Sequence, residues 1–159
     1  MLRHLSLSLF AAAALASAPV LAQPVVSYLK SGAKVAEVRD DLKAAIEAKG
    51  FVVDFESQIG SMLERTGKDI GATKTIYADA RVLQFCSAAL SRKMMEANPA
   101  NLVNCPWGIA VYATADKPDQ VVVSYRRLTP AGKPPRGGAV LREVEAVLDG
   151  LAREAAGKK

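Results

Sequence analysis

The segment Ile109–Leu128, IAVYATADKPDQVVVSYRRL, decides between two fold classes for this chain. Residues 109–114 and 121–128 are two runs rich in β-branched and aromatic side chains, and a polar stretch separates them. Two such runs around a short polar turn predict an antiparallel β-hairpin. A sheet that contains an antiparallel hairpin is not all-parallel, so the segment favours a two-layer α+β fold over a doubly wound α/β fold.

Helix-like and strand-like patterns alternate on both sides of this hairpin. Apolar residues recur at three- and four-residue steps from Val35 to Ile46, which is typical of an amphipathic helix, and Gly50 is suited to end it. The complete predicted set comprises strands at 25–29, 51–57, 80–85, 109–114 and 121–128, and helices at 33–49, 61–69, 88–97 and 139–155. The predicted order is therefore β-α-β-α-β-α-β-β-α, and each helix has one apolar stripe to bury against the sheet.

The first 22 residues have the pattern of a secretory signal peptide. A positive Arg3 precedes an apolar run, and small residues lead up to Ala22. We therefore predict cleavage near Ala22-Gln23, a single domain over residues 23–159, and a periplasmic or secreted protein. The apolar run is too short to span a membrane, and no later segment approaches roughly 20 apolar residues. We expect no integral membrane segment in the mature chain.

Removal of that segment would also remove His4, the only histidine in the chain. A mature chain without histidine excludes Ser-His-Asp and Cys-His catalysis and His-ligated metals, and two cysteines are too few for a closed zinc site. We therefore expect no metal and no cofactor, and an enzyme is less favoured than a binding protein. Loss of Arg3 would leave 20 of the 21 Lys and Arg residues against 16 Asp and Glu, a formal net charge of about +4. This dispersed excess does not predict a nucleic acid partner.

The chain contains two cysteines, Cys86 and Cys105. In an oxidising compartment an even pair most often forms a disulfide, and closing a loop of about 20 residues would stabilise the fold by about 3 kcal/mol. Alternatively, Cys86 lies where a strand passes into a helix, and a helix N-terminus lowers the pKa of a thiol. Cys86 would then be a nucleophile, sulfur acceptor or redox thiol, with Cys105 as its resolving partner. A third alternative is two buried free thiols.

Trp107 follows Cys105-Pro106 at the start of the predicted hairpin, and Met94 and Met95 lie in the preceding helix. We consider these three side chains as candidates for the wall of an apolar pocket. Core packing is the alternative, because methionine fills irregular gaps and tryptophan anchors small cores.

Four positive residues lie within 11 positions, namely Arg126, Arg127, Lys133 and Arg136. They are candidates for binding an anion or an acidic partner, and a solvated loop is the alternative. If the strand continues through Arg127, its two arginines project from opposite faces, so at most one of them faces a pocket.

Several segments resemble, in this order and spacing, a small bacterial family known as domain of unknown function 302 (DUF302). They are VAEVRDDLKAAIEAKGFVVDFE (35–56), GKDIGAT (67–73), RVLQFCSAALSRKMMEANP (81–99), NCPWGIAVY (104–112) and VVVSYRRL (121–128). The resemblance implies an α+β domain with a mixed or largely antiparallel sheet, helices packed mainly on one face, and dimerisation. It implies no established activity and assigns no role to the two sulfurs.

Two functions follow from these observations. The leading interpretation is an exported, non-enzymatic module that binds a small ligand or a periplasmic protein, with a homodimer through an exposed strand edge or the last helix as one form of it. The alternative is a periplasmic sulfur-transfer or redox protein that uses Cys86 and Cys105.

Overall fold

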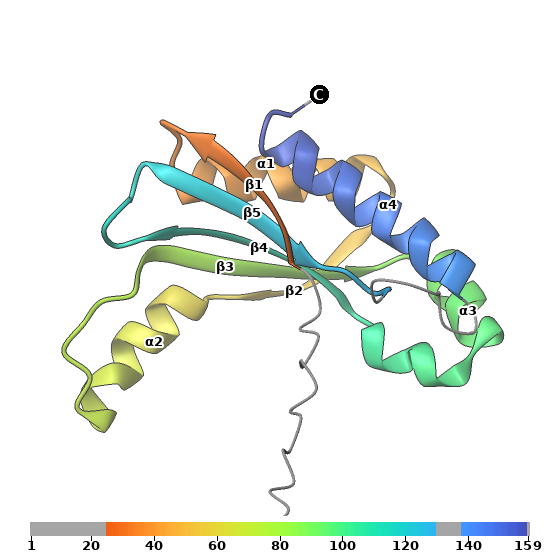
Figure 1. The fold of residues 1–159 in the computed structure, drawn as a ribbon, viewed down its shortest axis with the longest axis horizontal. Coiled ribbons are helices and arrows are strands. Elements are labelled where there is room, and N and C mark those ends of the chain that lie inside the picture. The colour runs from red at the N-terminus through yellow and green to blue at the C-terminus, as the bar shows by residue number, and fades with distance from the viewer. Residues whose placement is uncertain (1–24, 130–137, 159) are drawn as a thin grey trace, which may run out of the picture.

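A five-stranded antiparallel sheet organises the fold (Figure 1). The structure is a computed structural model that describes residues 25–129 and 138–158. The strands are β1 (Val25–Ser31), β2 (Val52–Ser57), β3 (Tyr77–Cys86), β4 (Trp107–Thr114) and β5 (Gln120–Arg126). Their order across the sheet is β1-β5-β4-β3-β2, and every neighbouring pair is antiparallel. The predicted hairpin is confirmed as β4 and β5.

The main helices lie on one face of this sheet. They are α1 (Val35–Ala48), α3 (Ala88–Ala97) and α4 (Gly138–Ala155). Helices α1 and α4 lie side by side across the sheet, and α3 closes the end of this layer against α4 (Figure 1). The other helical pieces, α2 (Ile59–Gly67) with the 3-10 helix η1 (Lys68–Ile70) and the 3-10 helix η2 (Pro99–Asn104), project from the opposite side. The predicted α+β class and the β-α-β-α-β-α-β-β-α order are therefore confirmed.

The hydrophobic core lies between the sheet and the three main helices. Each strand contributes every second residue, as β3 illustrates: Leu83 and Phe85 are fully buried, whereas Val82 and Gln84 on the other face are partly exposed. Trp107 packs edge-on against Phe85, with ring centroids 6.0 Å apart. The apolar stripe predicted for the first helix is the buried side of α1, and this helix ends before Gly50, whose φ of 76° is the left-handed conformation that favours glycine.

Two carboxylates of α4 attach this helix to the strands. Asp149 accepts hydrogen bonds from the hydroxyl groups of Tyr28 in β1 and Tyr125 in β5, at 2.5 and 2.9 Å. Burial and this carboxylate raise the pKa of Tyr125. Glu145 accepts from the backbone N–H and the hydroxyl of Thr129, at 2.6 and 2.9 Å. Asp149 thus joins α4 to β1 and β5, and Glu145 joins it to the segment that follows β5.

Helix α2 packs on the sheet by an unusually close backbone approach. A Cβ atom at Gly60 would lie 2.8 Å from the backbone nitrogen of Ala80 in β3. Only glycine therefore permits α2 to begin this near the sheet. The predicted helix at 61–69 is shifted, because α2 begins at Ile59 and its last turn is the 3-10 helix η1. In the part of the chain that the structure describes, no helix has both the length and the apolar character needed to cross a membrane.

Candidate functional site

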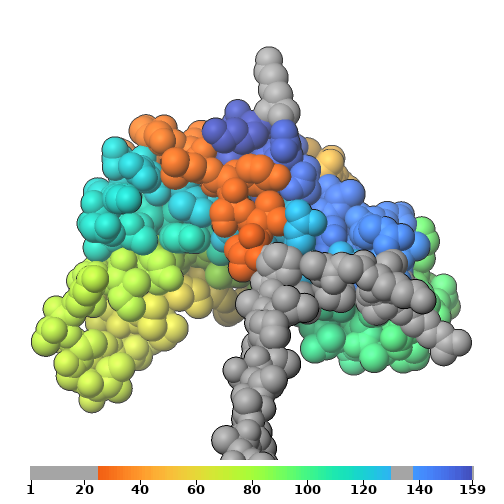
Figure 2. Space-filling model, in the orientation of Figure 1, coloured from red at the N-terminus to blue at the C-terminus, as the bar shows by residue number. Residues whose placement is uncertain are grey.

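Within residues 25–129 and 138–158, no helix covers the middle of the sheet face opposite α1 and α4, and we call it the open face. Helix α2 with η1 stands out from the body at one end of it, and η2 lies at the other end (Figures 1 and 2). Strand register assigns its residues as Val25, Ser27, Leu29 and Ser31 of β1, Gln120, Val122, Ser124 and Arg126 of β5, Gly108, Ala110, Tyr112 and Thr114 of β4, Ala80, Val82, Gln84 and Cys86 of β3, and Val52, Phe55 and Ser57 of β2.

The open face is poor in charge and rich in apolar and small hydroxyl side chains. Arg126 is the only charged residue among these positions, although 23% of the chain is charged. Several apolar side chains remain exposed, including Val52 at 69%, Phe55 at 61% and Leu29 at 43%. The solvated face of an antiparallel sheet ordinarily carries polar residues, and a contiguous neutral, apolar surface marks a site of interaction.

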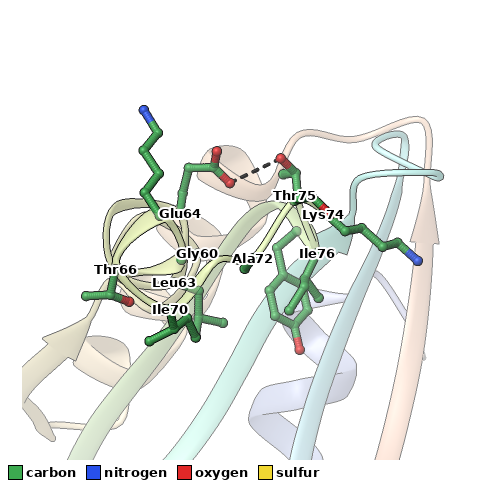
Figure 3. A pocket seen from close by; sticks show the side chains of 13 residues that line it. Gly60, Leu63, Glu64, Thr66, Ile70, Ala72, Lys74, Thr75 and Ile76 are labelled. Atoms are coloured by element: carbon green, nitrogen blue, oxygen red, sulfur yellow. Dashed lines mark hydrogen bonds between the residues drawn. The ribbon is translucent and has the colours of Figure 1, made fainter.

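A cavity of about 280 Å³ lies at the α2 end of the open face. Leu63 projects into it from the helix and Ile76 from the chain that leads into β3, while a 3.1 Å hydrogen bond from Thr75 to Glu64 spans its rim (Figure 3). Tyr77 also lines this cavity and contacts Tyr112 edge-on, with ring centroids 5.6 Å apart. The two tyrosine rings therefore join the cavity to the floor of the open face.

A second cavity, of about 380 Å³, lies at the η2 end. Its polar lining comes from Gln84 of β3, Asn104 of η2 and Arg126 of β5. Arg126 is exposed, and within residues 25–129 and 138–158 it makes no ion pair. Trp107 lines the same cavity, and its buried Nε1 has no hydrogen-bond partner among the described residues. This end of the open face thus combines a cation with neutral hydrogen-bond donors.

The two cysteines meet beside η2. Cys86 is the last residue of β3, Cys105 directly follows η2, and their Sγ atoms lie 2.6 Å apart. Both are half-buried free thiols, and the Oγ of Ser91 lies 3.8 Å from the Cys105 sulfur. Burial, and next the hydrogen bond to Cys105, raise the pKa of the Cys86 thiol to about 11. This direction is opposite to the lowering that a helix N-terminus would produce, and Cys86 lies one residue before Ser87, the N-cap residue of α3.

The remaining sequence-based candidates do not form one site. Met94 is fully buried in the core, Met95 lines a shallow groove with Leu102, and of the three pocket candidates only Trp107 lines the η2 cavity. Arg127 is exposed and is the residue after β5.

Lys133 and Arg136 lie outside the described residues. No group of three or more Asp, Glu, Cys or His side chains is placed to hold a metal ion in the described part of the chain.

The open face itself was not predicted from the sequence. Alternation within each strand places Val122 and Ser124 on the face opposite Val123, so the residues of one face of a single strand are readable, although Ser124 is itself buried. Which strands lie side by side, and hence the scarcity of charge over the whole surface, depends on the strand order. No sequence signal marks the α2 cavity, because it forms between a helix and an irregular segment.

Comparisons with known proteins agree with this architecture. No curated protein matches the chain. The crystal structure of an uncharacterized conserved DUF302 protein from Bacillus stearothermophilus superimposes with a TM-score of 0.65 at 14% sequence identity, over 81% of this chain and 97% of that chain. The family described as domain of unknown function DUF302 matches residues 28–155. This protein is therefore a member of the DUF302 family.

Proposed function

We propose that this protein is an exported, non-enzymatic binding module and that the open face is its binding surface. The observation that supports this most directly is a concave sheet face with a single charge, Arg126, in a chain of which 23% is charged. Burial of apolar surface stabilises a complex by about 25 cal/mol per Å². A ligand or partner that covers the exposed side chains of Phe55 and Leu29 would therefore be bound more tightly.

The two cavities favour a small bound molecule over a flat protein–protein contact. The α2 cavity and the η2 cavity lie at opposite ends of the open face, so a molecule bound across this face would contact a cavity wall at each end. Non-enzymatic binding is further supported by composition, since removal of the first 22 residues leaves a chain without histidine.

An uncharged apolar dye, Nile red, tests the binding surface without involving electrostatics. We expect the folded protein to raise the dye's fluorescence and Val122→Lys to abolish the increase, because Val122 lies on the open face with Leu29 beside it. Ala36→Lys adds the same charge on the exposed side of α1 and serves as the matched control, which retains the increase. An unchanged signal in Val122→Lys, with the fold intact by circular dichroism, would contradict an open-face site.

Export is tested separately. The pattern of the first 22 residues predicts that the protein recovered from a periplasmic fraction begins at Gln23. Intact mass determination of that fraction decides the point. A full-length cytoplasmic product would contradict the export half of the proposal and would leave the binding half standing.

The 2.6 Å approach of Cys86 and Cys105 favours a second candidate function in thiol redox chemistry. In such a reaction the two thiols lose two protons and two electrons to the disulfide of an oxidised partner, which becomes a dithiol while the Cys86–Cys105 bond forms. The raised pKa of Cys86, about 11, disfavours a resting thiolate nucleophile and so favours a stable Cys86–Cys105 disulfide. Alkylation of periplasmic material followed by mass determination tests this. Protection without reductant and a change of about 2 Da on reduction would support a bridge, whereas rapid alkylation of Cys86 would support a free nucleophile.

A further inference from the structure

We propose that the ligand of the open face is an amphipathic anion, a free aliphatic chain with one carboxylate headgroup. The carboxylate binds at Arg126 in the η2 cavity, and the chain lies across the sheet toward the α2 cavity. This inference rests on the proposed binding function of the open face and specifies the chemical class of the ligand.

The headgroup position follows from the location of the single charge. Arg126 lies opposite Val25 in the sheet register, at the end of β5, and it shares its cavity with the amides of Gln84 and Asn104. A guanidinium binds a carboxylate through two parallel hydrogen bonds, and neighbouring amides can donate further ones. Gly108 lines the same cavity and adds no side chain, which leaves room above the sheet for the headgroup.

The position of the ligand's aliphatic chain follows from the apolar residues in the middle of the open face. Val122 lies four residues before Arg126 on the same strand and the same face, which corresponds to roughly 14 Å along β5. Its neighbours on this face are Leu29 of β1 and Tyr112 of β4. An extended aliphatic chain advances about 1.25 Å per carbon–carbon bond, because bonds near 1.5 Å follow a zigzag, so about twelve carbon atoms span this distance and about ten cover most of it.

The far end of this path combines apolar and charged side chains. Tyr112 contacts Tyr77, and Tyr77 lines the α2 cavity together with Leu63 and Ile76. Figure 3 shows Leu63 and Ile76 on opposite walls of that cavity. A longer aliphatic chain would therefore reach a recess of about 280 Å³ in which Leu63, Ile76 and Tyr77 lie beside the charged Glu64, Lys68 and Lys74.

The same charge pattern disfavours a second copy of the protein as the occupant. In a symmetric dimer through the open face, the same surface meets itself, so Arg126 would need an acidic partner on that surface. None of the open-face positions assigned by register is acidic, and the exposed Asp54, in the bulge of β2, lies three strands away from β5. A self-contact would cover both arginines without neutralising them, whereas a carboxylate ligand supplies the missing charge.

Isothermal titration calorimetry with decanoate, decanol, decyltrimethylammonium and acetate tests the proposal on the protein as recovered from expressing cells. We expect decanoate to bind, both the alcohol and the cation to bind at least about tenfold more weakly, and acetate to give no measurable heat. Arg126→Gln should weaken decanoate binding by about tenfold or more and leave decanol binding unchanged. Arg127→Gln removes the adjacent charge, which lies outside β5 and does not line the η2 cavity, and should leave decanoate binding unchanged.

Three outcomes would overturn the proposal. If decanol binds as tightly as decanoate and Arg126→Gln has no effect, the headgroup assignment is wrong, although the open face remains a binding surface. If light scattering finds a dimer that Val122→Lys dissociates and decanoate does not, the occupant is a second copy. If neither the four probes nor Nile red binds and the protein is monomeric, the proposed function fails together with the ligand class.

Discussion

A bond between Cys86 and Cys105 is expected to stabilise this protein by about 3 kcal/mol relative to the reduced form. The perturbation is a change of redox state alone, with no substitution. The two sulfurs already lie 2.6 Å apart, so the bond would join the end of β3 to the end of η2 without moving either element. It would close a loop of about 20 residues, and the loss of chain entropy in the unfolded state gives the stated magnitude.

Urea unfolding with and without a phosphine reductant measures this difference. With a urea m-value of about 1–3 kcal/mol per M, the midpoint of the oxidised protein should lie roughly 1–3 M higher. The double variant Cys86→Ser/Cys105→Ser is the control, and its midpoint should not depend on the reductant. Alkylation and intact mass must first establish that the two samples differ in redox state.

Two results would refute this reasoning. If an oxidant such as oxidised glutathione leaves both thiols open to alkylation, the sulfurs do not meet in solution as they do in the structure. If the bond forms but the urea midpoints coincide, the disulfide does not raise the free energy of unfolding. Its role would then lie in redox exchange.

Three further predictions concern the fold around the site. The reduced protein should lose stability as the pH rises from about 9 to about 11, because burial raises the Cys86 pKa from 9.0 to about 11 and the unfolded chain therefore loses its proton first. Urea titrations across this range check it, and Cys86→Ser should show a smaller loss, since Tyr125, whose pKa is also raised, remains. Gly60→Ala should destabilise by about 1–3 kcal/mol because its Cβ would lie 2.8 Å from the Ala80 nitrogen. Gly150→Ala, with open space around the new Cβ in α4, should instead stabilise by about 0.5–1 kcal/mol. Thermal melts of both variants check these two predictions, and equal effects at the two glycines would contradict them. Trp107→Phe should cost only about 1–3 kcal/mol of unfolding free energy, since the indole Nε1 has no partner among the described residues; a substantially larger loss would reveal an additional contact.

The order of elements was predictable because it depends on local patterns. The apolar steps of α1 and the left-handed Gly50 after it are properties of neighbouring residues, and both agree with the structure. Helix α2 was placed two residues late because no side chain caps its N-terminus at Gln58. Strand β3 is longer than predicted because Tyr77 pairs with Thr114 beyond a bulge, which is a contact between distant parts of the chain.

The candidate site was only partly predictable. The sequence predicted that Arg126 and Arg127 project from opposite faces if the strand continues through both. Strand β5 ends at Arg126, and only the structure shows that this residue lies on a face with few charges. It identified Cys86 and Cys105 as a pair but left open whether they meet. It also grouped Met94 with Trp107, whereas the structure assigns the methionine to the core and lets only the tryptophan line a cavity.

The sequence by itself determined the α+β class, the antiparallel hairpin and the length of the loop between the cysteines, because periodicity and spacing are properties of short segments. Only the tertiary structure decided the strand order β1-β5-β4-β3-β2, in which the first described strand pairs with the last. In that order, alternate residues of five strands that are separated in the sequence lie together on the open face. Pairing of distant strands depends on burying the other face of the sheet beneath α1 and α4, so the sparse charge of the open face emerges only when the whole sheet is assembled.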